Sequence, residues 1–312
     1  MFAYILRRLW QMLPTMAGVV VLVFVLFNWV GGDPSYLLAG KMADARAIAN
    51  IRAQLGLDDP WYVQLGIFVR QIATFDFGNA WATGEPVSHI IQSRLGPSLT
   101  VLVPLTILDL MITISLALAV AYVRGSLTDR MVMIVTTVGL SVSILVYIIV
   151  FQYVFAYKLG WFPVQGWGDS FLENLFVYAS LPIFIGLVVS IAPNLRLYRT
   201  FVLDEINQDY VRTARAKGVS EPRVMLVHVL RNASIPIITN LMAGLPGLLL
   251  GSFLIERFFS IPGIGREVIL AVERSDFPVI KAITVYVAFA TIATNLLADL
   301  TYKAVDPRVQ LK

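Results

Sequence analysis

Cysteine is absent from this chain of 312 residues, and histidine occurs only as His89 and His228. Without cysteine the chain can form no disulfide framework, no iron–sulfur site and no thiolate nucleophile. The two histidines lie far apart and have no carboxylates at metal-ligand spacing, so we expect no zinc or nickel site within the chain. The sequence also lacks a G-x-x-x-x-G-K-S/T phosphate loop. Any ATP that drives this protein must therefore bind to a different polypeptide.

Charged residues are also scarce. They make up 14% of the chain, against 58% for hydrophobic residues, and the mean hydropathy is +0.76. A soluble domain has roughly a quarter charged residues and roughly half apolar residues. The composition therefore predicts an integral membrane protein, in which the placement of the charges matters more than their sum of +4.

Several apolar runs reach the length of about 20 helical residues that crosses a bilayer. We predict an all-α polytopic protein with six spans, at residues 9–30, 97–123, 131–157, 175–194, 233–255 and 279–302. The second, fourth and fifth spans contain prolines, which predict kinks that neighbouring helices must repair. The chain divides into residues 1–96, with the first span and a long loop, and residues 97–312, with the remaining spans.

The distribution of Lys and Arg predicts the orientation in the membrane. With the first residues inside, fourteen of these cations fall in inner segments and five fall in the two short outer loops, Lys281 among them. Because short cytoplasmic loops carry an excess of cations, we expect both termini in the cytoplasm. The apolar run after Arg7 and Arg8 is too long for a secretory signal and ends without a small-x-small cleavage site, so we interpret it as an uncleaved span.

The long loop between the first two spans predicts two short amphipathic helices. Residues 44–55 place Ile48, Ile51 and Leu55 on one helical face. After Gly56 and an Asp-Asp-Pro sequence, a second helical pattern runs from residue 61 to residue 72. Two interpretations stay open: these helices cover the spans or the bilayer surface, or they form a docking surface for an external protein.

Residues 203–232 include a polar, basic insert between the fourth and fifth spans. Helix-compatible residues run to Lys217, and Gly218 follows at a position where a left-handed C-terminal cap is typical. Ser220 can cap a second helix, whose first turn holds Glu221 and Pro222. We predict two short helices joined at the glycine, forming a knob at the inner membrane face that another protein contacts.

Sequence motifs point to one family of transporters. Arg212-Thr213-Ala214, separated by three residues from Gly218, resembles the Glu-Ala-Ala-x-x-x-Gly loop of binding-protein-dependent ABC importers. TARAKG followed by H-x-L-R-N resembles their peptide/nickel permease branch. Further matches in the same order are GDP at 32–34, LGLDDP at 55–60, DFGNA at 76–80, IPGIG at 261–265, DFP at 276–278, NLLADLTY at 295–302 and DPR at 306–308. The resemblance thus covers nearly the whole chain.

The chain departs from the general importer loop at two places. Arg212 stands where that loop has an acidic residue, and residues 228–231 read His-Val-Leu-Arg in place of I-x-L-P. Both departures resemble the peptide branch, so they narrow the subfamily.

The resemblance implies a type I ABC importer permease fold in a bacterial inner membrane, with a helical segment outside after the first span. The implied partners are a second, related but distinct permease subunit, two ATPase subunits that bind ATP and magnesium, and an extracytoplasmic substrate-binding protein. No cofactor, metal or catalytic residue is expected in this chain. The resemblance assigns ATPase coupling to Tyr210, Arg212, Thr213, Ala214, Arg215, Ala216, Lys217 and Gly218.

Three polar residues in or near the spans are candidates for a translocation path: Asp109, Asn240 and Glu256. A carboxylate inside an apolar span is costly, so Asp109 indicates either a functional group or a buried acid bonded to a neighbouring helix. Asn240 can instead form a hydrogen bond between helices. For Glu256 we favour a position at the interface, paired with Arg257 or another cation.

Peptides are the substrate class that the resemblance favours, with nickel chelates and other small solutes as alternatives. A secondary transporter would need intramembrane ionisable groups or inverted repeats, and Asp109 is the only strong candidate for such a group. An intramembrane enzyme would need paired catalytic groups at membrane depth, which the sequence lacks. We therefore predict the permease subunit of an ATP-driven importer.

Overall fold

The computed structural model describes residues 2–30, 32–39 and 44–305, and this part of the chain contains helices but no strand. The first span and the predicted outer segment comprise α1 (Phe2–Val25), α2 (Pro34–Ala39), α3 (Ala45–Gln54) and α4 (Trp61–Thr74). The remaining helices are α5 (Val87–Tyr122), α6 (Leu127–Ser141), α7 (Ile144–Phe151), α8 (Phe171–Glu173), α9 (Ser180–Ile206), α10 (Asp209–Ala216), α11 (Glu221–Arg223), α12 (Leu230–Leu250), α13 (Phe253–Phe258), α14 (Ile264–Glu273) and α15 (Phe277–Val305). The π-helical stretches η1 (Leu26–Val30), η2 (Gln152–Lys158), η3 (Asn174–Tyr178) and η4 (Val224–Val229) continue α1, α7, α8 and α11.

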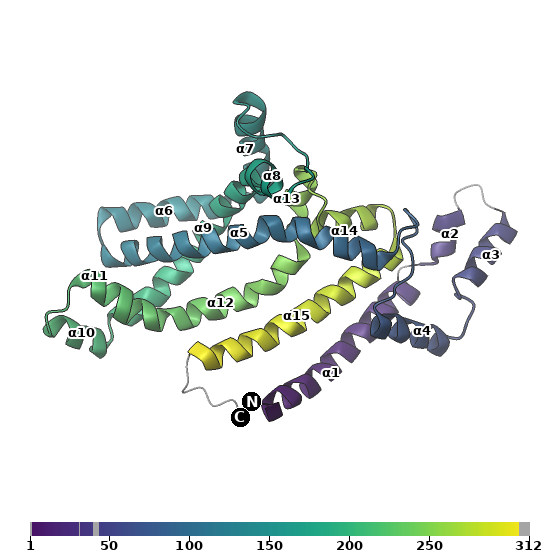
Figure 1. The fold of residues 1–312 in the computed structure, drawn as a ribbon, viewed down its shortest axis with the longest axis horizontal. Coiled ribbons are helices and arrows are strands. Elements are labelled where there is room, and N and C mark those ends of the chain that lie inside the picture. Colours follow the sequence, from purple (N-terminus) through teal and green to yellow (C-terminus); the bar gives the residue numbers. More distant parts are fainter. Residues whose placement is uncertain (1, 31, 40–43, 306–312) are drawn as a thin grey trace.

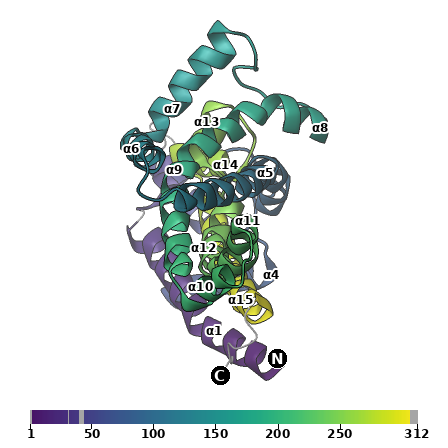
Figure 2. The same cartoon turned by 90° about the vertical axis from the view of Figure 1, so that its left-hand side faces the viewer.

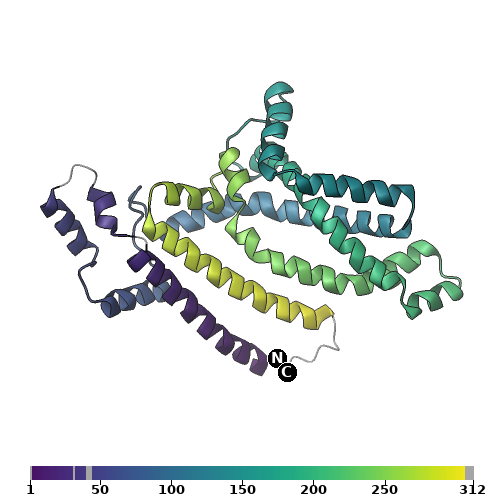
Figure 3. The same ribbon diagram turned by 180° about the vertical axis from the view of Figure 1, so that it is seen from behind.

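Long apolar helices dominate the architecture. Five of the described helices are long and apolar enough to cross a membrane, at Trp10–Trp29, Val87–Tyr122, Ser180–Ile206, Glu221–Gly247 and Phe277–Leu297. Figures 1 and 3 show α1, α15, α12 and α5 side by side, with α10 and α11 at one end of the molecule and α2 to α4 at the other. Figure 2 shows the molecule from the end that carries α10. The first residues of α1 and the last residues of α15 lie toward this end. The DPR motif at 306–308 lies outside the described residues.

The expected third span is a bent pair of helices. α6 and the helix formed by α7 and η2 meet at 93°, so the described residues contain five helices long and apolar enough to span a membrane, or six spans if this pair is one span. The backbone is extended at Val142, and Ser143 caps α7 by accepting a hydrogen bond from the amide of Leu145. Serine side chains compete with helical backbone hydrogen bonds, and a hydropathy pattern does not register this. The predicted span at 131–157 is therefore formed by two helices with a sharp bend between them.

Several boundaries also differ from the predicted spans. The second begins at Val87 rather than at residue 97. The fifth ends at Leu250, because Gly251, with φ +77°, turns the chain into α13 before residue 255. At its other end, α11, η4 and α12 form one helix from Glu221, so the second helix of the predicted knob is the beginning of a span.

The two predicted outer helices are present as α3 and α4. The carboxylate of Asp44 caps α3 by accepting a hydrogen bond from the amide of Ala47, at 2.8 Å. α4 buries Phe68 and Ile72 in an apolar cluster that includes residues of α1, α14 and α15. The predicted outer segment is therefore packed on the long helices α1 and α15.

Two of the short sequence motifs meet in this outer layer. Asp276, from the DFP motif, is buried at the start of α15. Its carboxylate oxygens accept hydrogen bonds from the amides of Trp81 and Ala82, at 3.1 and 3.0 Å. Those residues directly follow the DFGNA motif, so the two motifs together attach the loop between α4 and α5 to the beginning of α15.

Candidate functional site

The predicted knob begins with α10, an eight-residue helix between α9 and α11. Its end is set by Gly218, whose φ of +77° is the left-handed conformation expected from the sequence. The amide of Gly218 donates to the carbonyl of Arg215 at 2.9 Å, and the amide of Val219 donates to that of Ala214 at 3.3 Å. Ser220 has the extended backbone of an N-cap, but its side chain forms no capping hydrogen bond.

One face of α10 packs on the rest of the chain. Val211 is fully buried and Ala214 is 6% exposed, and both lie in an apolar cluster with Val202 of α9 and Val224 and Met225 of η4. This packing attaches α10 to the end of one spanning helix and the beginning of another. It also removes Ala214 from the surface that another protein could contact, unlike the arrangement expected from the sequence.

The opposite face of α10 is open and basic. Tyr210, Arg212, Thr213, Arg215, Ala216, Lys217 and Gly218 are all exposed, and the Arg212 side chain retains 72% of its accessible surface. We call these seven residues the knob surface. Its positive groups and its small residue, Ala216, lie where a partner could approach.

Two side-chain contacts support the knob surface. The Arg215 guanidinium binds the Glu221 carboxylate through Nε to Oε1 at 2.8 Å and Nη2 to Oε2 at 3.2 Å, which bridges the turn at Gly218. The Tyr210 hydroxyl donates to Glu205 Oε2. Partial burial, together with this bond to Glu205, raises the pKa of Tyr210 to about 12, so the hydroxyl remains a donor at physiological pH. Opposite charges six residues apart across a glycine were the sequence signal for the Arg215 pair.

A further ion pair fixes the neighbouring loop. Asp129, in the first turn of α6, accepts from Arg199 of α9 through two hydrogen bonds of 2.8 and 2.9 Å. The amide of Gly125 also donates to Asp129, at 2.9 Å. The sequence analysis missed this pair because its members lie 70 residues apart. It holds the turn between α5 and α6 against α9.

Asp109 and Asn240, two of the candidate path residues, lie on one cavity. The cavity has a volume of about 480 Å³ and is lined by residues of α5, α9 and α12. Asp109 is 7% exposed and accepts hydrogen bonds from Ser190 Oγ at 2.8 Å and Asn194 Nδ2 at 2.7 Å. The amide of Asn240 donates to the Tyr198 hydroxyl at 3.3 Å.

This polar cluster combines both interpretations of Asp109. The carboxylate is a buried acid bonded to a neighbouring helix, and it also faces a cavity among three spanning helices. Ser190, Asn194 and Tyr198 follow one another at intervals of four residues along α9 and therefore share one face. That spacing within an apolar span was the signal that could have identified them.

Glu256 lies in a different environment. It is 0% exposed, and its carboxylate accepts hydrogen bonds from Ser98 Oγ at 2.8 Å and from the amides of Ser252 and Arg266 at 3.1 and 3.0 Å. The expected pairing with Arg257 was wrong, because Arg257 binds Glu273 at 3.1 Å. Glu256 therefore holds the segment 261–265 in place and does not line the cavity at Asp109.

Among the residues that the structure describes, no group of three His, Asp or Glu side chains is arranged to hold a metal ion. The polar groups that it does bring together are hydrogen-bonding groups on spanning helices and cations on the knob surface. This arrangement suits passage of a polar solute and contact with another protein.

Comparison with known proteins places the chain among transport proteins. Residues 111–311 match the model of the family described as "Binding-protein-dependent transport system inner membrane component", and residues 1–117 match the model of its N-terminal region. The chain is 36% identical to the glutathione transport system permease protein GsiC of Salmonella typhimurium over 312 residues, covering all of both chains. It is 34% identical to a probable peptide ABC transporter permease protein of Sinorhizobium fredii, over 99% of this chain and 100% of the relative. It is 35% identical to a putative peptide transport system permease protein of Brucella abortus, over 99% of each.

Proposed function

Because the chain belongs to the family of binding-protein-dependent transport system inner membrane components, we propose that it is the permease subunit of an ATP-driven importer of peptides. Family membership implies an extracytoplasmic binding protein and an ATPase as partners. The chain is a multi-pass membrane protein, and in this proposal it has no catalytic activity of its own. ATP and magnesium bind to the ATPase subunits.

The attachment of α10 to two spanning helices is the observation that carries this proposal. Val211 and Ala214 bury α10 against α9 and η4, and η4 continues into α12. Close-packed interiors transmit displacement because they have few voids to absorb it. A movement of the knob surface by an ATPase is therefore passed to α9 and α12, both of which line the cavity at Asp109.

The same cavity supports a role in translocation. A peptide has amide and charged groups that are costly to move through hydrocarbon, so it needs a path lined by hydrogen-bonding groups. Asp109, Tyr198 and Asn240 supply such groups among α5, α9 and α12. In this proposal the chain forms half of the path, and a second, related permease subunit forms the other half.

The names of the relatives support peptides as the substrate class. Those from Sinorhizobium and Brucella are named for peptide transport, and GsiC for glutathione, which is a tripeptide. The external binding protein would select and deliver the substrate. Nickel chelates and other small solutes are the alternative that a binding screen on that partner would test.

We place both termini and the knob surface in the cytoplasm, because the inner segments hold most of the Lys and Arg residues. α1 begins and α15 ends toward the same end of the molecule as α10, which supports this orientation (Figure 1). A reporter fused after Asn79 should then read outside the cytoplasm. A cytoplasmic signal from that fusion would contradict the orientation.

Substitution of Ala216 tests the coupling role. Ala216→Trp adds bulk to the knob surface without entering the core, since Ala216 is exposed. Overpacking a contact costs about 1–3 kcal/mol, so we expect about tenfold less ATPase to co-purify. Ala49→Trp, on the exposed face of α3 at the other end of the molecule, is the matched control and should retain the ATPase.

Substrate-stimulated ATP hydrolysis in liposomes gives an independent reading. It should fall in Ala216→Trp and remain at the wild-type level in Ala49→Trp, with similar thermal unfolding of all three chains. If Ala216→Trp retained both the ATPase and the stimulated hydrolysis, the knob surface would not be the coupling site.

A further inference from the structure

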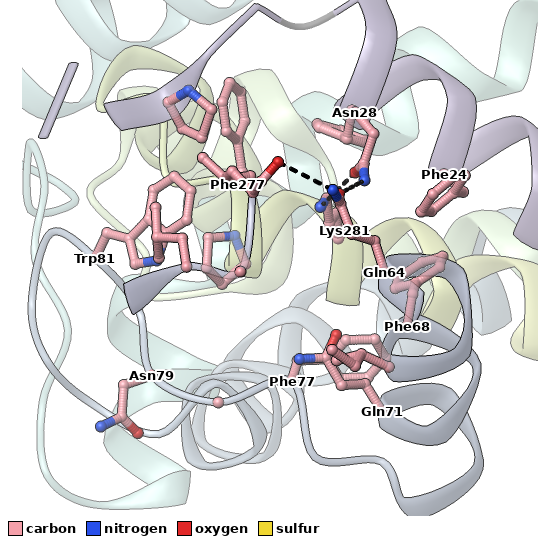
Figure 4. A pocket seen from close by; sticks show the side chains of 18 residues that line it. Phe24, Asn28, Gln64, Phe68, Gln71, Phe77, Asn79, Trp81, Phe277 and Lys281 are labelled. Carbon is pink, nitrogen blue, oxygen red and sulfur yellow. Dashed lines mark hydrogen bonds between the residues drawn. The ribbon is translucent and has the colours of Figure 1, made fainter. Parts of the chain in front are cut away.

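A second cavity lies in the outer segment, far from α10. It has a volume of about 260 Å³ and lies between the outer end of the first spanning helix, α4 and the first turns of α15. Figure 4 shows the Lys281 side chain among aromatic rings and amide side chains, with Asn28 and Gln64 close to it. Those rings include Phe24, Phe68 and Phe277.

Lys281 brings a positive charge into this cavity without a matching acid. Its Nζ lies 5.7 Å from the ring centroid of Phe27 and 5.8 Å from that of Phe68. Its polar contact is with Asn28 Oδ1, at 3.4 Å, and Asn28 Nδ2 donates in turn to Gln64 Oε1 at 2.6 Å. Within the described ranges, no carboxylate forms an ion pair with Lys281, and none of the residues that line the cavity is acidic.

The nearby carboxylate of Asp33 has other partners. It binds the Arg52 guanidinium and accepts a hydrogen bond from the amide of Ser35, at 2.9 Å. Lys281 is partly buried. Removing part of the hydration of an ammonium group is costly unless an opposite charge or several hydrogen bonds compensate it. Two aromatic faces and one long hydrogen bond supply part of this compensation. An anion in the cavity would supply the rest.

The surroundings of the cavity indicate where such an anion comes from. Ile67 lines the cavity and is 47% exposed, so the cavity borders the apolar outward face of α4. Trp29, Tyr36, Trp61 and Tyr62 are exposed on η1, α2 and α4, which also contribute to the lining. Exposed Trp and Tyr residues at the end of a spanning helix are typical of the membrane–water interface. The cavity therefore lies at the depth of lipid headgroups.

We propose that this cavity binds the phosphodiester group of an anionic phospholipid. The Lys281 ammonium binds the phosphate oxygens, and the rings of Phe27 and Phe68 contact the apolar part of the lipid beside it. Such a lipid would connect the first span, α4 and α15, and so fasten the outer segment to the membrane. The inference does not depend on the substrate or on the ATPase.

Native mass spectrometry of the full chain in detergent, with dioleoyl-phosphatidylglycerol or dioleoyl-phosphatidylcholine added, tests the proposal. The wild type should retain the anionic lipid in preference to the zwitterionic one. One cation near a lipid surface contributes about 1 kcal/mol, so Lys281→Met should retain about fivefold less phosphatidylglycerol. Lys281→Arg keeps the charge and should retain most of it. Lys158→Met removes an exposed lysine of η2 and should behave as the wild type.

Several results would overturn the proposal. Equal retention of the two lipids by the wild type would be one, and unchanged retention by a folded Lys281→Met chain would be another. In a parallel experiment, millimolar inorganic phosphate replaces the lipid. Binding of phosphate without binding of phosphatidylglycerol would assign the cavity to a free anion instead.

Discussion

Two glycines at opposite ends of the molecule are required for opposite reasons. Gly218, beside the knob surface, has a φ of +77°, and a Cβ placed there would meet no atom within 4 Å. Gly263, in the segment 261–265 between α13 and the first residues of α14, has an ordinary φ of −101°, but its Cβ would lie 2.3 Å from Glu256 Oε2 and 2.5 Å from Ser98 Oγ. The first position therefore needs glycine for its backbone and the second for its lack of volume. The turn at Gly218 is open on one side, whereas the segment 261–265 is closely packed.

Glu221, beside the turn at Gly218, and Glu256, beside Gly263, also differ in their exposure to solvent. Glu221 forms an exposed pair with Arg215, and exposed pairs contribute about 0–1 kcal/mol. Glu256 is buried and accepts hydrogen bonds from one hydroxyl and two backbone amides. Leaving a buried donor without its acceptor costs about 1–3 kcal/mol. We call Glu256 and its donors Ser98, Ser252 and Arg266 the clasp. Stability should therefore depend strongly on the clasp and weakly on the knob.

Gly263→Ala should give the largest loss of stability. The added methyl group clashes with Glu256 and Ser98, and both are held in the packed core, so we expect a loss of about 3 kcal/mol. Thermal unfolding of the purified chain measures this. Gly18→Ala is the control, because a Cβ at Gly18 has no atom within 4 Å and alanine favours a helix. Unfolding of Gly263→Ala at the wild-type temperature would show that the segment 261–265 is loosely packed.

Glu256→Gln should give the next largest loss. Glutamine replaces one acceptor oxygen of Glu256 by an NH₂ donor. One of the hydroxyl or amide donors around it then loses its acceptor, which should lower the free energy of unfolding by about 2 kcal/mol. The same change at Glu221 should cost less than about 1 kcal/mol, because that pair is exposed to solvent. Equal shifts in the thermal unfolding of the two variants would remove the distinction between the clasp and the knob.

Gly218→Val should have a smaller effect on stability than Gly263→Ala, and a large effect on transport. A β-branched residue disfavours positive φ, and the strain costs about 1–2 kcal/mol. Membrane abundance should stay near the wild-type level, while substrate-stimulated ATP hydrolysis falls because α10 is displaced. Gly218→Asn, which tolerates this conformation better, should recover part of the hydrolysis. If the valine variant transported substrate at the wild-type rate, the turn at Gly218 would not be required for coupling.

The knob shows which structural features can be predicted from residues that are close together in the sequence. The end of α10 at Gly218 was predictable, since helix termination depends on residues within one turn. The burial of Ala214 was missed, although Val211 and Ala214 are three residues apart and so share a helical face. Neither residue by itself indicates whether that face meets η4 or an ATPase, because the packing partners are remote in sequence.

The hydrogen-bond partners of Glu256 could not be predicted from the residues next to it in the sequence. Neighbouring residues on a helix point in different directions, so Arg257 was a poor candidate for its partner. The actual donors include Ser98, 158 residues away, and the partner of Arg257 is Glu273. The close approach also depends on Gly251, Gly263 and Gly265, whose conformations and neighbours come from the packing of α13 against α14.

The sequence by itself determined the all-helical membrane class, most of the spanning segments, the two outer helices and the turn at Gly218, because burial of apolar runs and helix caps depend on residues close together in the chain. Only the tertiary structure decided the bend between α6 and α7, the partners of Asp109 and Glu256, and the position of Lys281 in a cavity whose lining contains no acidic residue. These depend on which helices lie side by side. That arrangement follows from the fit of many side chains across the whole molecule, so no single segment contains it.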